Sequence, residues 1–204
     1  MATASAGWEF ELAGGHPALD LVNTVAWRLD PARTVDRISG FSSLARWSAA
    51  AGLIAPDVET DLLQQAAARP DRAQEALREA RAIREAVHGV AGAVADGREP
   101  GEHHLNTVHR MLARAIGRAE IASVVPWRWT LRPRAPADLP WAIALAAGRL
   151  FQEEDLTRLR RCHDAGCGWL FLDRSRNGSR RWCSSADCGN RARARRHYER
   201  HRTS

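Results

Sequence analysis

The sequence predicts a mostly α-helical domain with a small strand element, followed by a cysteine-rich module made of a β-hairpin and a helix. Three observations lead to this fold class. Apolar residues recur at helical spacing along most of the chain before residue 155. All four cysteines fall between residues 162 and 188, and positive charge gathers in the same region. We expect a helical domain over residues 8–155 and a basic module over 158–202, docked on it because the junction is short.

The N-terminal segment predicts a short strand and then a helix. Apolar and polar residues alternate over residues 8–12, which is typical of a strand with one buried face. Gly14 and Gly15 end this strand. Pro17 suits the first turn of a helix, which we expect over residues 18–25.

The middle of the chain predicts four helices. One covers residues 43–51 and the next begins near Asp57. The third is the clearest, because Asp71 can cap it, Gly97 can close it, and apolar residues between them form one stripe. The fourth is marked by apolar residues at helical spacing, namely Leu105, Val108, Leu112 and Ile116.

A strand and a sixth helix complete the predicted domain. Trp127, Trp129 and Leu131 alternate with polar residues, which favours a strand that ends before Pro133. The helix begins after Asp138 and places apolar residues on one side, namely Leu139, Ile143, Ala146 and Leu150.

The cysteines have the spacing of a structural zinc site. Two C-x4-C pairs are separated by fifteen residues, as in a zinc-ribbon or treble-clef module. Four thiolates fill the tetrahedral shell of zinc, which disfavours a catalytic zinc and also His163 as a substitute ligand. Two disulfides or four free thiols are the alternatives, but disulfides require an oxidising compartment. We predict one structural Zn²⁺ held by Cys162, Cys167, Cys183 and Cys188.

The residues between the cysteine pairs predict a hairpin. Residues 169–172 form an apolar strand, Asn177-Gly178 favours a tight turn, and residues 180–182 would be the returning strand. A helix is expected over residues 189–202. Its N-terminal dipole favours an ionised thiolate at Cys188.

The C-terminal module is strongly basic. Residues 158–204 contain thirteen arginines and four acidic residues, a net charge of +9, whereas the whole chain carries +6. The preceding part is therefore mildly acidic, and the asymmetry points to a polyanionic partner for the module. Every basic residue is arginine, which codon bias in a GC-rich genome also explains, so position is more informative than residue identity.

Nucleic acid is the partner that this charge favours, with DNA preferred over RNA. The alternatives are docking of the basic end on the acidic body and a merely solvated charged end. Trp169, Phe171 and Trp182 could stack on bases, although a role in the small core of the module is favoured. The expected contacts lie at the hairpin tip and on the last helix, namely Arg174, Arg176, Arg180, Arg181, Arg191, Arg193, Arg195 and Arg196.

A polar group near the N-terminus suggests a ligand pocket. His16, Asp20 and Asn23 lie among apolar residues at the start of the first predicted helix. The alternative is structural, because Asp and Asn near a helix start often satisfy backbone groups and lock neighbouring elements together.

Several classes of protein are disfavoured. The sequence contains neither a Gly-rich phosphate loop nor a nucleophile elbow, so we do not expect an enzyme. Its first fifteen residues lack the pattern of a signal peptide, and the longest apolar stretch is too short to cross a bilayer. We expect a soluble cytoplasmic protein without a membrane partner.

Two motifs resemble known bacterial families. Cys183-Ser184, followed by three residues and Cys188-Gly189-Asn190-Arg191, resembles the signature of the CGNR zinc finger. Gly14-Gly15, with Pro17-Ala18-Leu19-Asp20-Leu21 and Asn23-Thr24 after it, resembles the opening of the ABATE domain. The resemblance implies a transcription regulator linked to stress responses, with a zinc-bound DNA-binding end whose ligands are the four cysteines.

We therefore expect a DNA-binding regulator in which the helical domain senses a small-molecule effector or forms a homodimer. One alternative is an enzyme or ligand-binding protein that works around Asp20 and Asn23, with the zinc module only as a support. The other is a protein-interaction module whose basic end binds an acidic protein.

Overall fold

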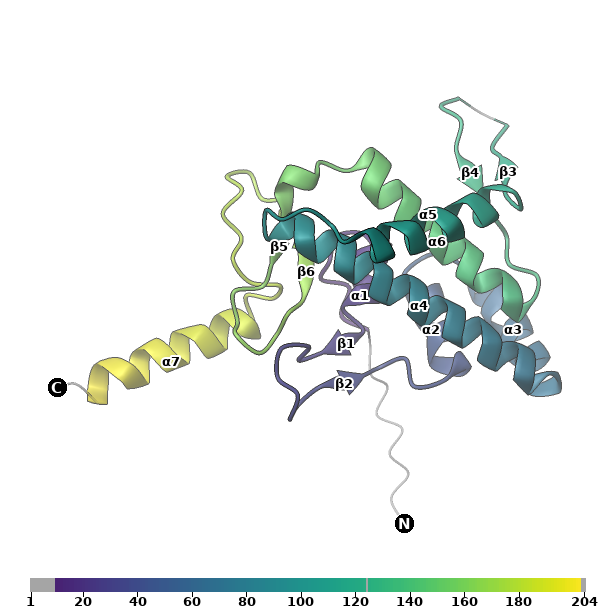
Figure 1. The fold of residues 1–204 in the computed structure, drawn as a ribbon. Coiled ribbons are helices and arrows are strands. Elements are labelled where there is room, and N and C mark those ends of the chain that lie inside the picture. The colour runs from purple at the N-terminus through teal and green to yellow at the C-terminus, as the bar shows by residue number, and fades with distance from the viewer. Residues whose placement is uncertain (1–9, 124, 203–204) are drawn as a thin grey trace, which may run out of the picture.

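A computed structural model describes residues 10–123 and 125–202 (Figure 1). Its central element is the long helix α4, against which the shorter helices α1, α2, α5 and α6 pack. This arrangement confirms the mostly helical fold class. The helices of the body are α1 (Pro17–Val22), α2 (Phe41–Ala50), α3 (Pro56–Ala68), α4 (Pro70–Ala95), α5 (Glu102–Ile116) and α6 (Leu139–Glu153).

The core of the body follows the apolar stripes of these helices. On α4, Leu77, Ile83 and Val87 are each 1% exposed, and they lie in one core cluster with Leu139 and Ile143 of α6. Burying such side chains contributes about 2 kcal/mol each, so packing rather than helix propensity stabilises the body.

The ends of two helices differ from the prediction. The first helix stops at Val22 instead of residue 25, because the Thr24 hydroxyl donates to the Leu21 carbonyl oxygen at 2.6 Å and competes with another helical turn. In α4, the cap position is Arg69, and Asp71 lies inside the first turn. Gly97 does follow the helix end, with φ of +67°, a backbone conformation that favours glycine.

Two small hairpins belong to the body. Strand β1 (Val25–Ala26) pairs antiparallel with β2 (Val35–Asp36), and β3 (Glu120–Ile121) pairs with β4 (Trp129–Thr130). The expected strand around Trp129 is therefore present. The expected strand over residues 8–12 lies partly outside the described residues, and its residues 10–12 are not in a strand.

The C-terminal module contains a hairpin and a helix, but the hairpin pairs differently from the prediction. Strand β6 (Leu170–Leu172) pairs with β5 (Leu159–Arg161), which precedes it, and not with residues 180–182. The first cysteine pair supplies the turn between these strands. Residues 180–182 are held instead by a bond from the Arg180 backbone N–H to the Asp173 carboxylate at 2.8 Å. The last helix is α7 (Cys188–Arg202).

The module is docked on the body through buried polar contacts. The Asn23 side-chain amide donates to the Leu170 carbonyl oxygen at 2.8 Å, and its oxygen accepts from the Leu170 N–H at 3.0 Å. The Trp169 indole N–H donates to the Val25 carbonyl oxygen at 3.0 Å. At the periphery, Arg161 of β5 forms an ion pair with Asp96 beyond the end of α4.

Among the described helices, none is both long and apolar enough to span a membrane.

Candidate metal centre

The first cysteine pair lies on the turn between β5 and β6. Cys162 continues the hairpin, since its N–H donates to the Trp169 carbonyl oxygen at 2.8 Å. The turn is closed by the buried Asp164, whose carboxylate accepts from the Gly166 N–H at 3.1 Å and whose carbonyl accepts from the Cys167 N–H at 3.0 Å. These bonds fix the backbone so that both thiols point to the same side.

The second pair lies where the chain enters α7. Cys188 is the first residue of that helix. A tight turn precedes it, in which the Gly189 N–H donates to the Ser184 carbonyl oxygen at 2.9 Å and the Asp187 N–H donates to the Ser184 hydroxyl at 3.2 Å. This turn brings Cys188 to the side of Cys183 that faces the first pair.

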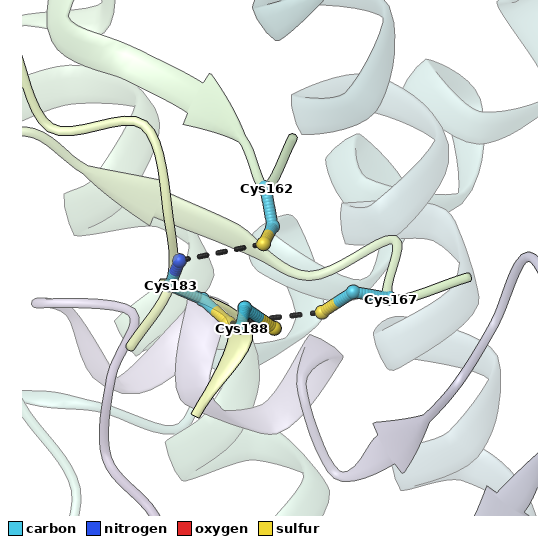
Figure 2. A group of neighbouring side chains, drawn as sticks. All are labelled: Cys162, Cys167, Cys183 and Cys188. Carbon is cyan, nitrogen blue, oxygen red and sulfur yellow. Dashed lines mark hydrogen bonds between the residues drawn. The ribbon is translucent and has the colours of Figure 1, made fainter. Parts of the chain in front are cut away.

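The four sulfur atoms converge on one point (Figure 2). All lie within 4.8 Å of one another, with Cys183 Sγ at 3.6 Å from Cys167 Sγ and 3.5 Å from Cys188 Sγ. Ligands at about 2.3 Å from a tetrahedral zinc are about 3.8 Å apart. The cluster therefore fits one structural Zn²⁺ with four cysteine ligands, and each cysteine is at most 6% exposed.

Neither disulfides nor a histidine ligand fits this geometry. The four cysteines are not joined in disulfides, and sulfur separations of 3.5–3.6 Å are far from the bonded distance of about 2.05 Å. His163 turns to solvent, where its Nδ1 accepts from the Arg181 guanidinium at 3.3 Å, so it is not a ligand.

The charge of such a cluster requires a cation. Contacts with the neighbouring thiols, Cys167 first, lower the pKa of Cys162, whereas contacts with Cys162 and the other thiols raise the pKa of Cys183. Without metal, the buried sulfurs therefore cannot all ionise together. A zinc ion offsets this repulsion when bound, and Arg191 adds to the compensation by donating to Cys188 Sγ at 2.8 Å.

Three of the predicted DNA-contacting arginines contact the helical body. Arg174 donates to the Gly15 carbonyl oxygen and pairs with Glu154 at 2.7 Å, which ties the module to the body. Arg180 donates to carbonyl oxygens of the finger and of Ala13, and its guanidinium lies 4.2 Å from the centre of the Phe171 ring.

Arg191 is the third. It binds Asp164 at 3.4 Å and also contacts Asp187, and its guanidinium lies 4.4 Å from the centre of the Trp27 ring. The other predicted contact residues are exposed, namely Arg176, Arg181, Arg193, Arg195 and Arg196. Of these, Arg195 also pairs with Asp164 of the first cysteine turn at 3.5 Å.

The polar group near the N-terminus has structural partners. Asp20 accepts from the Gly14 N–H at 2.7 Å, Asn23 binds Leu170, and His16 accepts from the Ala18 N–H at 3.2 Å. The gap beside Asp20 and Asn23 has no room for a water molecule. Burial raises the pKa of Asp20 to about 6. These contacts favour the structural interpretation over a ligand pocket.

Sequence reasoning missed the contacts between the body and the metal centre. The loop after β1 donates two backbone N–H groups to the first cysteine turn, from Arg28 to the Cys167 carbonyl oxygen at 3.1 Å and from Leu29 to the Gly166 carbonyl oxygen at 3.3 Å. Trp27 adopts φ of +56°, which is unusual for a bulky residue. No spacing or composition signal in the sequence marks these contacts.

The fold and the cysteine cluster define the class as a zinc-finger protein with a helical body. Comparison with known families identifies both parts. Residues 15–154 match the ABATE family, described as "Putative stress-induced transcription regulator", and residues 158–201 match the CGNR zinc finger. The chain belongs to the ABATE family and carries a CGNR zinc finger. A comparison with curated proteins finds no significant match. The matched families suggest a regulatory role rather than an enzymatic one.

Proposed function

We propose that the chain is a DNA-binding transcription regulator that places α7 against the DNA backbone. The observation that carries this proposal is the form of α7. The helix begins at a metal ligand and extends away from the body (Figure 1). From Arg193 to His201 its side chains are exposed, including those of Arg195 and Arg196. A rigid basic helix of this kind suits contact with phosphates, which releases condensed counterions.

The proposal divides the chain into a helical body over residues 8–155 and a zinc module over 158–202. The body would hold the module in place through the Asn23 and Arg28 contacts. Sensing of a small-molecule effector and formation of a homodimer remain predictions for the body, as does a cytoplasmic location for the chain.

The test must use arginines whose removal leaves the metal centre intact. Arg191 is unsuitable, because its removal would leave the buried Asp164 with one fewer partner and would remove a donor to Cys188. Arg193 and Arg196 are better, since neither donates to a sulfur atom or to Asp164. Arg196 donates to the Ala192 carbonyl oxygen within α7. Arg193 donates to the Asn190 amide oxygen and to the Ser185 carbonyl oxygen in the second cysteine turn, so the double variant must first be shown to keep its zinc.

The experiment is a titration of labelled duplex DNA, followed by fluorescence anisotropy at several salt concentrations. We expect R193Q/R196Q to bind more weakly and to reduce the slope of log K against log salt by about 0.9 for each phosphate that the helix no longer neutralises. The matched control is R72Q/R78Q, which removes the same charge from exposed positions on α4. Equal slopes for the two double variants would contradict the proposal.

A competition separates DNA from an acidic protein as the partner. Polyglutamate offers the same sign of charge without phosphate geometry. We expect duplex DNA to displace polyglutamate at equal charge concentration, and displacement in the opposite direction would favour a protein-interaction module instead.

A further inference from the structure

The second half of α7 contains a pair of histidines that neither the zinc centre nor the proposed DNA contacts require. His197 and His201 are one helical turn apart, and both are exposed. Their Nε2 atoms face each other at 3.2 Å, and their ring centroids are 4.4 Å apart.

We propose that these two imidazoles form a second metal site, for a divalent transition metal such as Zn²⁺, Ni²⁺ or Cu²⁺. Imidazole nitrogens bind these ions at about 2.0–2.1 Å. Two nitrogens 3.2 Å apart, each at that distance, subtend an angle of about 100° at the metal. This value lies between the angles of octahedral and tetrahedral coordination, so the separation of the two nitrogens suits one shared ion.

Two side chains on the preceding helical turn leave the histidine pair uncovered on that side. Arg193, one turn before His197, directs its guanidinium towards the helix start, where it donates to the Ser185 carbonyl oxygen at 3.0 Å. Ala194, three residues before His197, adds only a methyl group. Because both imidazoles are exposed, solvent can reach the remaining coordination positions of a bound ion.

This site differs in kind from the cysteine centre. Among the described residues, the only group of three or more potential ligands is the cysteine cluster, so the histidine pair has two protein ligands. Two neutral ligands on a basic helix hold an ion less tightly than four thiolates, so the site is exchangeable. A bound ion would link consecutive turns of α7 and present open coordination positions to an oxygen ligand such as phosphate.

The experiment measures metal content and uses the full chain, purified without a histidine tag and loaded with one zinc. Ni²⁺ is the probe, because imidazole suits nickel whereas the thiolates favour zinc. After equilibrium dialysis against Ni²⁺, elemental analysis should find one zinc and one nickel per wild-type chain. H197Q and H201Q should each keep the zinc and lose the nickel.

A matched control and a second measurement make the outcome decisive. H109Q removes an exposed histidine of α5 and should keep both metals. Nickel should also raise the far-ultraviolet helical signal of the wild type and leave that of H197Q unchanged. Absence of nickel from the wild type, or equal nickel in the wild type and H197Q, would overturn the proposal whether or not the chain binds DNA.

Discussion

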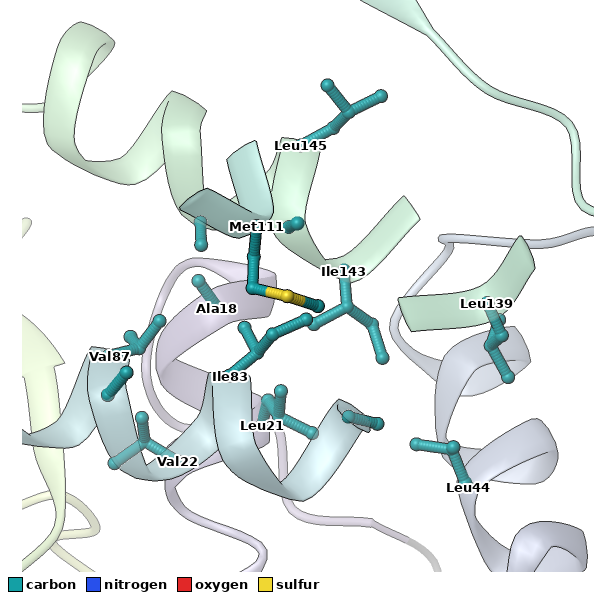
Figure 3. Packing of buried hydrophobic residues seen from close by; sticks show 14 of the residues in the cluster. Ala18, Leu21, Val22, Leu44, Ile83, Val87, Met111, Leu139, Ile143 and Leu145 are labelled. Atoms are coloured by element: carbon teal, nitrogen blue, oxygen red, sulfur yellow. The ribbon is translucent and has the colours of Figure 1, made fainter. Parts of the chain in front are cut away.

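The helical body and the zinc module are stabilised by different means. The body buries a continuous apolar core between long helices, as the packing of Ile83, Met111 and Ile143 illustrates (Figure 3). The module has strands of three residues, and its own cluster consists mainly of the four cysteines with Trp169 and Phe171. A core this small cannot offset the entropy of ordering its chain, so the metal must supply much of the free energy.

The boundary between the two regions is not a flexible linker. The Leu159, Leu170 and Leu172 side chains of the module belong to the core of the body. Asn23 and the loop after Trp27 supply the polar contacts. The module therefore depends on zinc at one end and on the body at the other, whereas the body has a core of its own.

Removal of zinc should have the largest effect. Chelation of the zinc, made possible by mild denaturation, removes its contribution to the free energy of folding. This contribution is about 10–16 kcal/mol for structural zinc in small zinc fingers. We expect α7 and the cysteine turns to unfold while the body keeps its helices. Far-ultraviolet circular dichroism should then lose only the signal of the 15 residues of α7. Complete loss of helical signal would contradict this division of the molecule, because it would make the body dependent on the metal.

The boundary itself is tested by N23A. The substitution removes the Asn23 side-chain amide, so the buried N–H and carbonyl groups of Leu170 lose their hydrogen bonds to it. Each lost bond costs about 1–3 kcal/mol. Chemical denaturation should show a decrease of about 2–6 kcal/mol in the free energy of unfolding, and zinc should dissociate faster.

T107A is the matched control for this variant. The buried Thr107 hydroxyl donates to the His103 carbonyl oxygen of its own helix, so its removal strands no backbone group between the two regions. Zinc release should therefore match that of the wild type. If N23A and T107A released zinc at the same rate, the Asn23 contact would not hold the module in place.

The body and the ligands of the metal were predictable from the sequence, since both depend on local patterns. The stripe on α4 and the C-x4-C pairs are visible in the order of residues alone. The predicted partner of β6 was wrong. The partner of a strand depends on where the chain folds back, and here the turn with the first cysteine pair places β5 beside β6.

The roles of single polar residues were less predictable. Arg191 has the same spacing signal as Arg195, and both pair with Asp164, but Arg191 also donates to Cys188 Sγ, which makes it part of the metal centre. Asn23 binds a backbone 147 residues away in the chain, and no local pattern encodes such a contact. Charge clustering therefore indicates a basic surface, whereas only the fold shows what each arginine on that surface contacts.

The smallest effect concerns Asp20, beside the boundary. Burial raises its pKa to about 6 in the folded chain, against 3.8 for the ordinary group. The native state therefore holds a proton that the unfolded state has lost, and stability falls as pH rises from about 4 to about 6, by at most about 3 kcal/mol.

D20N keeps an oxygen for the Gly14 N–H without the charge. Denaturation curves of D20N at about pH 4, where this decrease begins, and at about pH 7.5, where it is complete, should show less pH dependence than those of the wild type. At the higher pH, the stability of D20N should equal or exceed that of the wild type. A clear decrease in the stability of D20N there would mean that the carboxylate charge is needed, and the structural interpretation of Asp20 would have to give way to a site that uses that charge.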